Sequence, residues 1–168
     1  MIVALFGPSC TGKTTIAQRV MSELGLPLRS CGEAVKLKAG VLGLPLTELS
    51  DDEHRRIDDE TRRWALANSP CLVEGRYLDR VLSPIASRVT LVRLDARNAD
   101  REARRTPPDR VPLTITEEDL QDSLFGARMY NSMNQLAPQL ILDSSELTVG
   151  VCVQRVIALI AALRKAPG

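Results

Sequence analysis

The sequence predicts an α/β protein, a three-layer α/β/α sandwich in which a five-stranded parallel sheet lies between two layers of helices. Short apolar runs such as 2–6 and 70–76 alternate with longer segments whose apolar residues recur every three to four positions. Nearly continuous apolar runs are typical of parallel strands buried on both faces, and the segments between them are typical of helices that cover those faces. With 168 residues, the chain is long enough for one domain with a sizeable core and too short for two.

A glycine-rich loop, residues 7–14, joins the first apolar run to the first helical pattern. It reads Gly-Pro-Ser-Cys-Thr-Gly-Lys-Thr and matches G-x-x-x-x-G-K-[ST]. In such a loop the backbone N–H groups surround a phosphate, and the positive end of the following helix points at the same oxygens. Lys13 is expected to reach the β and γ phosphates and the Thr14 hydroxyl to ligate magnesium, so ATP and Mg2+ are the expected cofactors. The predicted donor-binding residues are Gly7, Ser9, Cys10, Thr11, Gly12, Lys13, Thr14 and Thr15.

The first half of the chain follows the strand–helix alternation but adds a helical segment. The helix after the loop has an apolar residue at every fourth position until a glycine ends it. The segment 26–30 predicts a weak edge strand because it contains a proline. Helices are expected over 34–42 and from about 51 to 68, and the second is predicted to start at Ser50, which has capping-box spacing to Glu53.

The second half repeats the alternation. The predicted strands are 70–76, 88–94 and 139–145, and the predicted helices are a short piece at 78–85, 98–105, 116 to about 136, and a closing helix after 147. Thr116 and Asp119 have capping-box spacing at the start of the long helix. The predicted buried stripe of that helix is Leu120, Leu124, Ala127 and Met133.

The whole chain, 1–168, is predicted to be a single domain. Its core comprises 1–30, 70–100 and 113–165, a helical insertion spans 31–69, and a small arginine-flanked lid spans about 101–112. The strand 70–76 ends with Glu74 and Arg76, at the sheet edge where parallel α/β proteins bind ligands. A phosphoryl transferase needs a second substrate pocket and a way to exclude water, and the two excursions suit that need.

Composition limits the partners that we expect. The formal net charge is +1 and aromatic residues make up 3%, which disfavours a nucleic acid polymer or an anionic membrane and leaves small-molecule nucleotides. One histidine and four scattered cysteines disfavour structural zinc and a disulfide framework. No signal-type segment is recognised, so a soluble cytoplasmic protein is expected. The oligomeric state is left open.

Several further motifs occur in order along the chain. They are Ser30–Lys36, Ile57–Arg63, Val73–Arg76, an arginine-bearing segment 101–110, Arg128–Tyr130, and Asp143–Leu147. Together with the glycine-rich loop, they resemble the nucleoside monophosphate kinases, most closely the short, archaeal-type cytidylate kinases. The resemblance covers about the whole chain. It implies the P-loop kinase fold, with 31–69 as the insertion that binds the acceptor.

The resemblance also implies site roles. Glu74 would orient magnesium-bound water, so the metal site would comprise Thr14 and Glu74. Asp58 would accept from the exocyclic amine of a cytosine base, which makes CMP or dCMP the first acceptor. The acceptor-binding residues would be Gly32, Lys36, Asp58, Arg62, Arg63, Glu74, Gly75 and Arg76. The residues acting on the transferring group would be Lys13, Arg76, Arg104, Arg110 and Arg128, with Arg101 and Arg105 as alternative lid arginines.

Two alternatives stay open. Lys36 stands where the family has an arginine and is a point charge in place of a bidentate fork, so the acceptor could instead be a modified nucleotide or another small metabolite of a biosynthetic pathway. Outside the kinases, a nucleotide-dependent switch would bind a nucleoside triphosphate and transfer its phosphate only to water.

Overall fold

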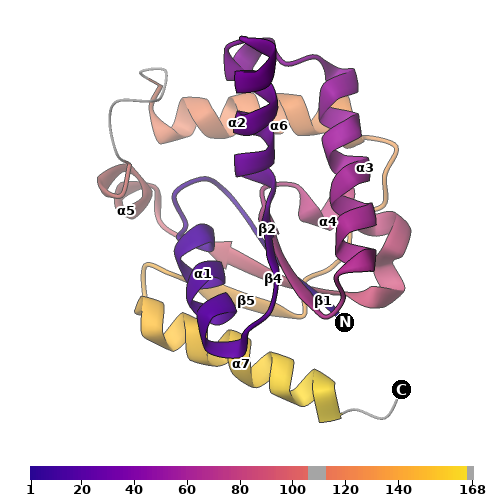
Figure 1. The fold of residues 1–168 in the computed structure, drawn as a ribbon. Helices are drawn as coiled ribbons and strands as arrows, with labels where there is room; N and C mark the ends of the chain where they lie inside the picture. Colours follow the sequence, from indigo (N-terminus) through magenta and orange to yellow (C-terminus); the bar gives the residue numbers. More distant parts are fainter. Residues whose placement is uncertain (106–112, 166–168) are drawn as a thin grey trace.

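The computed structural model describes residues 1–105 and 113–165 (Figure 1). Within them, five parallel strands form one sheet in the order β2-β3-β1-β4-β5, which confirms the predicted α/β sandwich. The strands are β1 Ile2–Phe6, β2 Leu28–Ser30, β3 Cys71–Gly75, β4 Val89–Asp95 and β5 Leu140–Asp143. The helices are α1 Lys13–Leu24, α2 Cys31–Leu42, α3 Asp51–Ala67, α4 Leu78–Val81, α5 Asn98–Ala103, α6 Ile115–Tyr130 and α7 Val149–Lys165, with 3-10 helices at Leu46–Glu48 and Ser83–Arg88.

The central strand β1 contributes to two hydrophobic cores because its side chains alternate between the two faces of the sheet. Val3 and Leu5 pack with residues of α1 and α7 on one face. Ile2, Ala4 and Phe6 pack on the other face with residues of α3, α4 and α6. All five side chains are buried, as the continuously apolar run predicts.

The register of the sheet places the glycine-rich loop beside the end of β3. Leu5 pairs with Glu74, and Phe6 pairs with Gly75. Both strands therefore end at the same level, and Arg76 follows β3 where Gly7 follows β1. On the other side of β1, Phe6 pairs with Arg93 of β4. The edge expected to bind ligands thus carries the loop and the Glu74–Arg76 segment together.

Residues 31–69 contain α2, the first 3-10 helix and α3. Ala39, Leu49 and Ile57 form a small core of their own between these helices. The Ser50 hydroxyl accepts a hydrogen bond from the Glu53 N–H at 3.3 Å, which confirms the predicted start of α3. The division into core, insertion and lid stays a prediction, and residues 106–112 of the predicted lid lie outside the described residues. None of the helices described here combines the length and the apolar character needed to cross a membrane.

The predictions for α6 were partly wrong. The helix starts at a capping box formed by Thr114 and Glu117, two residues before the predicted one, and ends at Tyr130 instead of near 136. Leu120 and Leu124 of the predicted buried stripe are 62% and 64% exposed. The buried residues of α6 are Ile115, Glu118, Met129 and Tyr130. The helix turns a partly charged face inward because arginines of the core are there to pair with it.

Candidate active site

The loop at residues 7–14 has a backbone that ordinary residues adopt with difficulty. Gly12 is the N-cap of α1 with φ 87°, and Gly7 has φ 137°. A Cβ atom at Gly7 would lie 2.1 Å from the Leu94 carbonyl oxygen, so only glycine fits against β4 there. Cys10 has φ 59° although it carries a side chain. These positive φ angles let the chain turn back sharply between β1 and α1, so that the loop lies at the N-terminus of α1.

Lys13 begins α1 and is 8% exposed. Its Nζ donates to the carbonyl oxygen of Pro8 at 2.5 Å, so the ammonium is folded back onto its own loop. Burial lowers the pKa of Lys13 to about 8, although the nearby Glu74 carboxylate acts in the opposite direction. In the part of the chain that the structure describes, the ammonium donates to one carbonyl group and forms no direct ion pair, so it is suited to bind a phosphate anion.

Four hydroxyl side chains belong to the loop or directly follow it. The buried Ser9 Oγ has no hydrogen-bond partner among the described residues. A phosphate oxygen beside the loop would satisfy this donor. The Thr11 hydroxyl donates to the Pro8 carbonyl at 3.0 Å and therefore supports the loop itself. Thr14 and Thr15 are exposed in the first turn of α1, where their hydroxyls are open to a ligand.

The metal prediction rests on Thr14 and Glu74. Among the described residues, no group of three or more His, Cys, Asp or Glu side chains could hold a metal ion. Mg2+ at phosphotransfer sites is held by one or two protein oxygens with substrate phosphates and waters, so the exposed Thr14 hydroxyl fits such a site. Glu74 is buried, and its carboxylate accepts a hydrogen bond from the Ser30 hydroxyl at the N-cap of α2.

Arg76 follows β3 and is held by two carboxylates of α6. Its guanidinium donates to Asp122 and, at 3.0 Å, to Glu118. The Tyr77 hydroxyl donates to the Asp122 carbonyl at 3.0 Å and fixes α6 against the same segment. The flanking carboxylates raise the pKa of Arg76 against the effect of burial. The two carboxylates of α6 therefore fix the position of the Arg76 guanidinium at the sheet edge.

The described arginines of the predicted lid segment, Arg101 and Arg104, have different partners. Arg101 is buried, donates through Nε to the Ser9 carbonyl at 2.9 Å and forms two bonds to Asp119, at 2.7 and 2.6 Å. Arg104 donates to the hydroxyl and carbonyl of Ser144 after β5, at 2.8 and 2.7 Å. Arg110 lies outside the described residues. Arg101 therefore bonds directly to the loop, whereas Arg104 bonds to Ser144, whose hydroxyl lies 3.0 Å from the loop carbonyl of Thr11.

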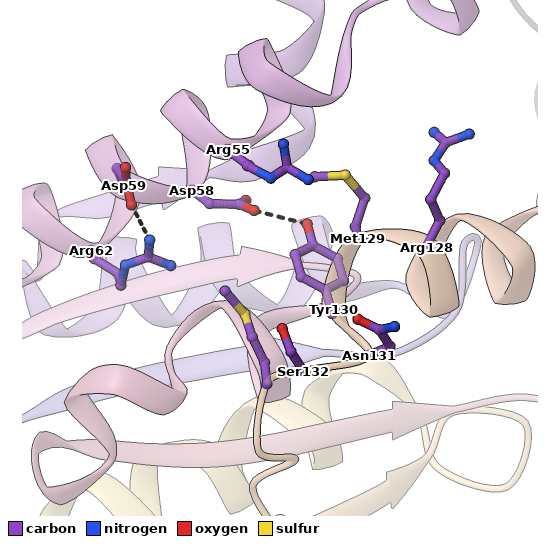
Figure 2. A pocket seen from close by; sticks show the side chains of 10 residues that line it. Arg55, Asp58, Asp59, Arg62, Arg128, Met129, Tyr130, Asn131 and Ser132 are labelled. Carbon is purple, nitrogen blue, oxygen red and sulfur yellow. Dashed lines mark hydrogen bonds and ion pairs between the residues drawn. The ribbon is translucent and has the colours of Figure 1, made fainter.

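A second concave region lies between α3 and the end of α6 (Figure 2). This pocket has a volume of about 270 Å³. Its lining residues are Arg55, Asp58, Asp59, Arg62, Arg128, Met129, Tyr130, Asn131, Ser132 and Met133. Three side chains predicted from the sequence, Asp58, Arg62 and Arg128, therefore line the same pocket.

Asp58 and Tyr130 form the polar centre of the α3/α6 pocket. The Tyr130 hydroxyl donates to Asp58 Oδ2 at 2.9 Å. Burial raises the pKa of Asp58 to about 6, although this hydrogen bond lowers it. Arg62 is tied to the Val81 carbonyl at 2.8 Å and to Asp59, whereas Arg128 pairs with Asp51 at 2.9 Å and is mostly exposed. The pocket thus combines guanidinium groups with a carboxyl group that titrates near pH 6.

Solved structures of other proteins share the fold of this chain. No protein-family model matches the chain. It is similar to solved structures of a sugar kinase from Janibacter sp. HTCC2649 (TM-score 0.64, 21% identity, covering 95% of this chain and 94% of the other) and of shikimate kinase from Acinetobacter baumannii in complex with shikimate (0.68, 15%, 98% and 95%). A gluconokinase from Sinorhizobium meliloti 1021 is also similar (0.65, 16%, 96% and 91%). The chain has the P-loop kinase fold. At these identities the likeness shows the fold alone and does not single out the cytidylate kinases.

Within this P-loop kinase fold, some predicted acceptor residues stand apart. Lys36 and Gly32 are exposed on α2 and Arg63 is exposed on α3, away from the α3/α6 pocket lining. Gly75 faces the first residue of α2, because a Cβ atom there would lie 3.0 Å from the Cβ of Cys31. The structure thus brings together Glu74, Gly75 and Arg76 near the loop, and Asp58, Arg62 and Arg128 at the pocket.

Sequence reasoning missed the carboxylates of α6. Glu118 and Asp122 bind Arg76, and Asp119 binds Arg101. The sequence predicted only a capping role for Asp119, with Thr116, and no binding role for Glu118 or Asp122. The available signal was that Glu118 and Asp122 are four residues apart, hence on one face of the helix. That face is the one turned to the arginines.

Proposed function

We propose that this protein is a P-loop kinase that transfers the γ-phosphoryl group of ATP to a small acceptor. The observation that carries the proposal is the loop at 7–14, where a buried Lys13 ammonium and a Ser9 hydroxyl that has no partner in the described part of the chain flank the N-terminus of α1. All three features favour a bound phosphate chain. The nearby Glu74 and Arg76 provide a carboxylate and a guanidinium where the transferred group would lie.

In this proposal, the residues of the loop and of the end of β3 have separate roles in phosphoryl transfer. Lys13 and the loop N–H groups would bind the β and γ phosphates, and the Thr14 hydroxyl would ligate Mg2+, whose charge offsets that of the phosphates. Glu74 would orient water bound to the metal, and Arg76 would stabilise negative charge on the moving group. In the transfer, an acceptor oxygen forms a bond to the γ phosphorus as the bond to the bridging oxygen of ADP breaks. No covalent enzyme intermediate is needed.

For the acceptor, we propose a nucleoside monophosphate, with CMP or dCMP first, giving the diphosphate. Asp58 in the α3/α6 pocket supports this choice because an ionised carboxylate accepts from the exocyclic amine of cytosine, whereas uracil presents an oxygen there. Arg76 at the sheet edge would then hold the acceptor phosphate. The acceptor would lie along α6, between the loop and the pocket.

A second candidate acceptor is a hydroxyl-bearing metabolite. One observation favours it: Arg76 is already paired with Glu118 and Asp122, while Lys36 and Arg63 are exposed away from the α3/α6 pocket lining. A monophosphate would have to displace these carboxylates, whereas a neutral hydroxyl group would not. Kinases of similar fold include a sugar kinase, a shikimate kinase and a gluconokinase. We further propose that the protein acts on such small molecules in the cytoplasm, without a nucleic acid polymer or membrane as partner.

An acceptor screen tests the proposed function. ADP release would be followed in a coupled assay with ATP and Mg2+, with CMP, dCMP, UMP, AMP, GMP, sugars and hydroxy acids added singly. Release that depends on CMP or dCMP supports the first candidate, and release that depends on a sugar or hydroxy acid supports the second. Release at the same rate without any acceptor would indicate a nucleotide-dependent switch and contradict the kinase proposal.

A further inference from the structure

We propose that Asp119 is a positioning residue for the donor phosphates, acting through Arg101 on the peptide between Ser9 and Cys10. The inference rests on the proposed function of the loop and extends it to a carboxylate on α6, outside the loop motif. The three groups come from separate parts of the chain, namely the loop, α5 and α6. Their hydrogen bonds form one continuous connection.

The connection is made by a single planar group. Both terminal nitrogens of Arg101 donate to the two oxygens of Asp119, at 2.7 and 2.6 Å, and Nε donates to the Ser9 carbonyl at 2.9 Å. Asn98 Oδ1 accepts a further bond at 3.2 Å. The two bonds to Asp119 fix the plane of the guanidinium, and because the group is rigid they also fix the direction of its Nε–H. Arg101 is 2% exposed, so water does not provide replacement partners.

The bond from Arg101 sets the orientation of a backbone N–H in the loop. In a trans peptide the C=O and the N–H point in opposite directions. Because the Ser9 carbonyl points at Arg101, the N–H of Cys10 points away from it, toward the other side of the loop. That N–H is among the loop donors expected to bind phosphate. Arg101 thereby selects which side of the loop presents the donor.

The backbone of Cys10 needs such a support. Its φ of 59° is unfavourable for a residue with a Cβ atom, and conformations of this kind persist where the surroundings hold them. The hydrogen bond from Arg101 to the Ser9 carbonyl, directly before Cys10, stabilises this conformation. Loss of the Asp119 carboxylate would leave the Arg101 fork free to turn and the 9–10 peptide free to relax. The expected consequence is weaker ATP binding with an intact acceptor pocket, since Asp119 is not among the residues that line it.

The test compares calorimetric ATP binding by the full-length chain with Mg2+ present. The variants are Asp119→Asn, Asp119→Glu and a control, Glu60→Gln, which removes an exposed carboxylate of α3 that lies 3.8 Å from Arg29 of β2. We expect Asp119→Asn to weaken ATP binding by about ten-fold, as for loss of a charge-assisted hydrogen bond, and Asp119→Glu to stay within about three-fold of wild type. Glu60→Gln should bind as wild type does. With an acceptor found, Asp119→Asn should raise the KM for ATP and leave the KM for the acceptor unchanged.

If Asp119→Asn does not fold, Arg101→Lys replaces it, because a lysine keeps the charge but cannot bridge Asp119 and the Ser9 carbonyl in one plane. Wild-type ATP affinity in either folded variant overturns the inference and leaves the proposed function standing. An Asp119→Glu chain as weak as Asp119→Asn also overturns it, because the loss then follows from altered packing. A wild-type chain that binds no ATP overturns both the inference and the proposed function.

Discussion

The loop at residues 7–14 and the α3/α6 pocket are built in opposite ways. The loop is eight consecutive residues whose backbone carries the geometry, with Gly7, Cys10 and Gly12 at positive φ. The pocket is assembled from long side chains of α3 and the end of α6, elements that are far apart in sequence. Tyr130 lies eleven residues after Asp119 on α6, which places it about 16 Å along the helix axis from the residue that supports the loop. A site made by backbone is specified locally, whereas a site made by side chains depends on which partners the fold presents.

The largest effect is expected at the loop. Replacing Lys13 with alanine removes the only buried lysine among the described residues and should lower kcat/KM for phosphoryl transfer by about 10³-fold, in the range of other charge-stabilising groups. The fold should persist, since among the described residues the Lys13 ammonium bonds to one carbonyl group, which belongs to its own loop. The ADP-release assay measures the loss, and thermal unfolding checks the fold. Lys165→Ala at the end of α7 is the matched control, and a Lys13→Ala chain with wild-type activity would contradict the role of the loop.

Glycine replacements test whether backbone fit is decisive. Gly7→Ala should destabilise the protein by about 3 kcal/mol or more, because the added Cβ would lie 2.1 Å from the Leu94 carbonyl oxygen at a φ that alanine avoids. Gly40→Ala is the control: it lies within α2, its added Cβ meets no atom within 4 Å, and alanine is the better helix former. Urea unfolding measures both. Equal stabilities of the two variants would show that the loop tolerates a different backbone.

A pair of arginine variants tests the pocket side of the comparison. Arg62→Ala should cost about 1–2 kcal/mol of stability because its guanidinium bonds to the Val81 carbonyl in a partly buried position. Arg128→Ala should cost less than about 1 kcal/mol, since its ion pair with Asp51 is exposed. Its effect should appear in acceptor affinity, as a KM higher by about ten-fold. An Arg128→Ala chain with an unchanged acceptor KM would remove this residue from the acceptor site.

The smallest expected effect is a pH dependence of acceptor binding. Because burial raises the pKa of Asp58 to about 6, the side chain is mostly protonated below that pH; it then has no negative charge and accepts from an amine only through its neutral carbonyl oxygen, which is a weaker bond. Acceptor affinity should therefore fall as the pH drops below about 6, by less than about ten-fold per pH unit, while ATP affinity is not affected through this group. The native state also binds the proton more tightly than the unfolded chain, so this group lowers stability as the pH rises from about 4 to about 6.

Two variants check the assignment of this titration. Asp58→Asn should abolish both pH effects. Tyr130→Phe should move the midpoint to higher pH, because the Tyr130 hydroxyl lowers the pKa of Asp58. A midpoint that stays in place in Asp58→Asn would assign the titration to another group. Acceptor titrations between pH 5 and pH 8 are the measurement.

The same contrast explains which predictions from the sequence succeeded. The order of strands and helices and the starts of α1 and α3 followed from apolar runs, glycines and capping spacings, which act within a few residues. The loop followed from its motif for the same reason. The buried face of α6 was predicted wrongly because Leu120 and Leu124 repeat at helical spacing, whereas the face turned inward is the one on which Glu118 and Asp122 pair with Arg76.

Side-chain partners were the least predictable part. Arg104 bonds to Ser144 and Arg128 to Asp51, because a long guanidinium takes whichever acceptor the tertiary structure brings near it. Asp58 and Arg62 did come together, since their four-residue spacing puts them on one face of α3. The spacing predicts that both side chains lie on the same face of α3, and the tertiary structure shows that this face packs beside the end of α6.

The most direct test of the central claim is a crystal structure with a non-hydrolysable ATP analogue and Mg2+. The account predicts the β and γ phosphates against the backbone N–H groups of the loop, the Lys13 ammonium moved from the Pro8 carbonyl to those phosphates, and the Ser9 hydroxyl bonded to a phosphate oxygen. A structure that shows the analogue elsewhere, with Lys13 still on Pro8, would contradict it.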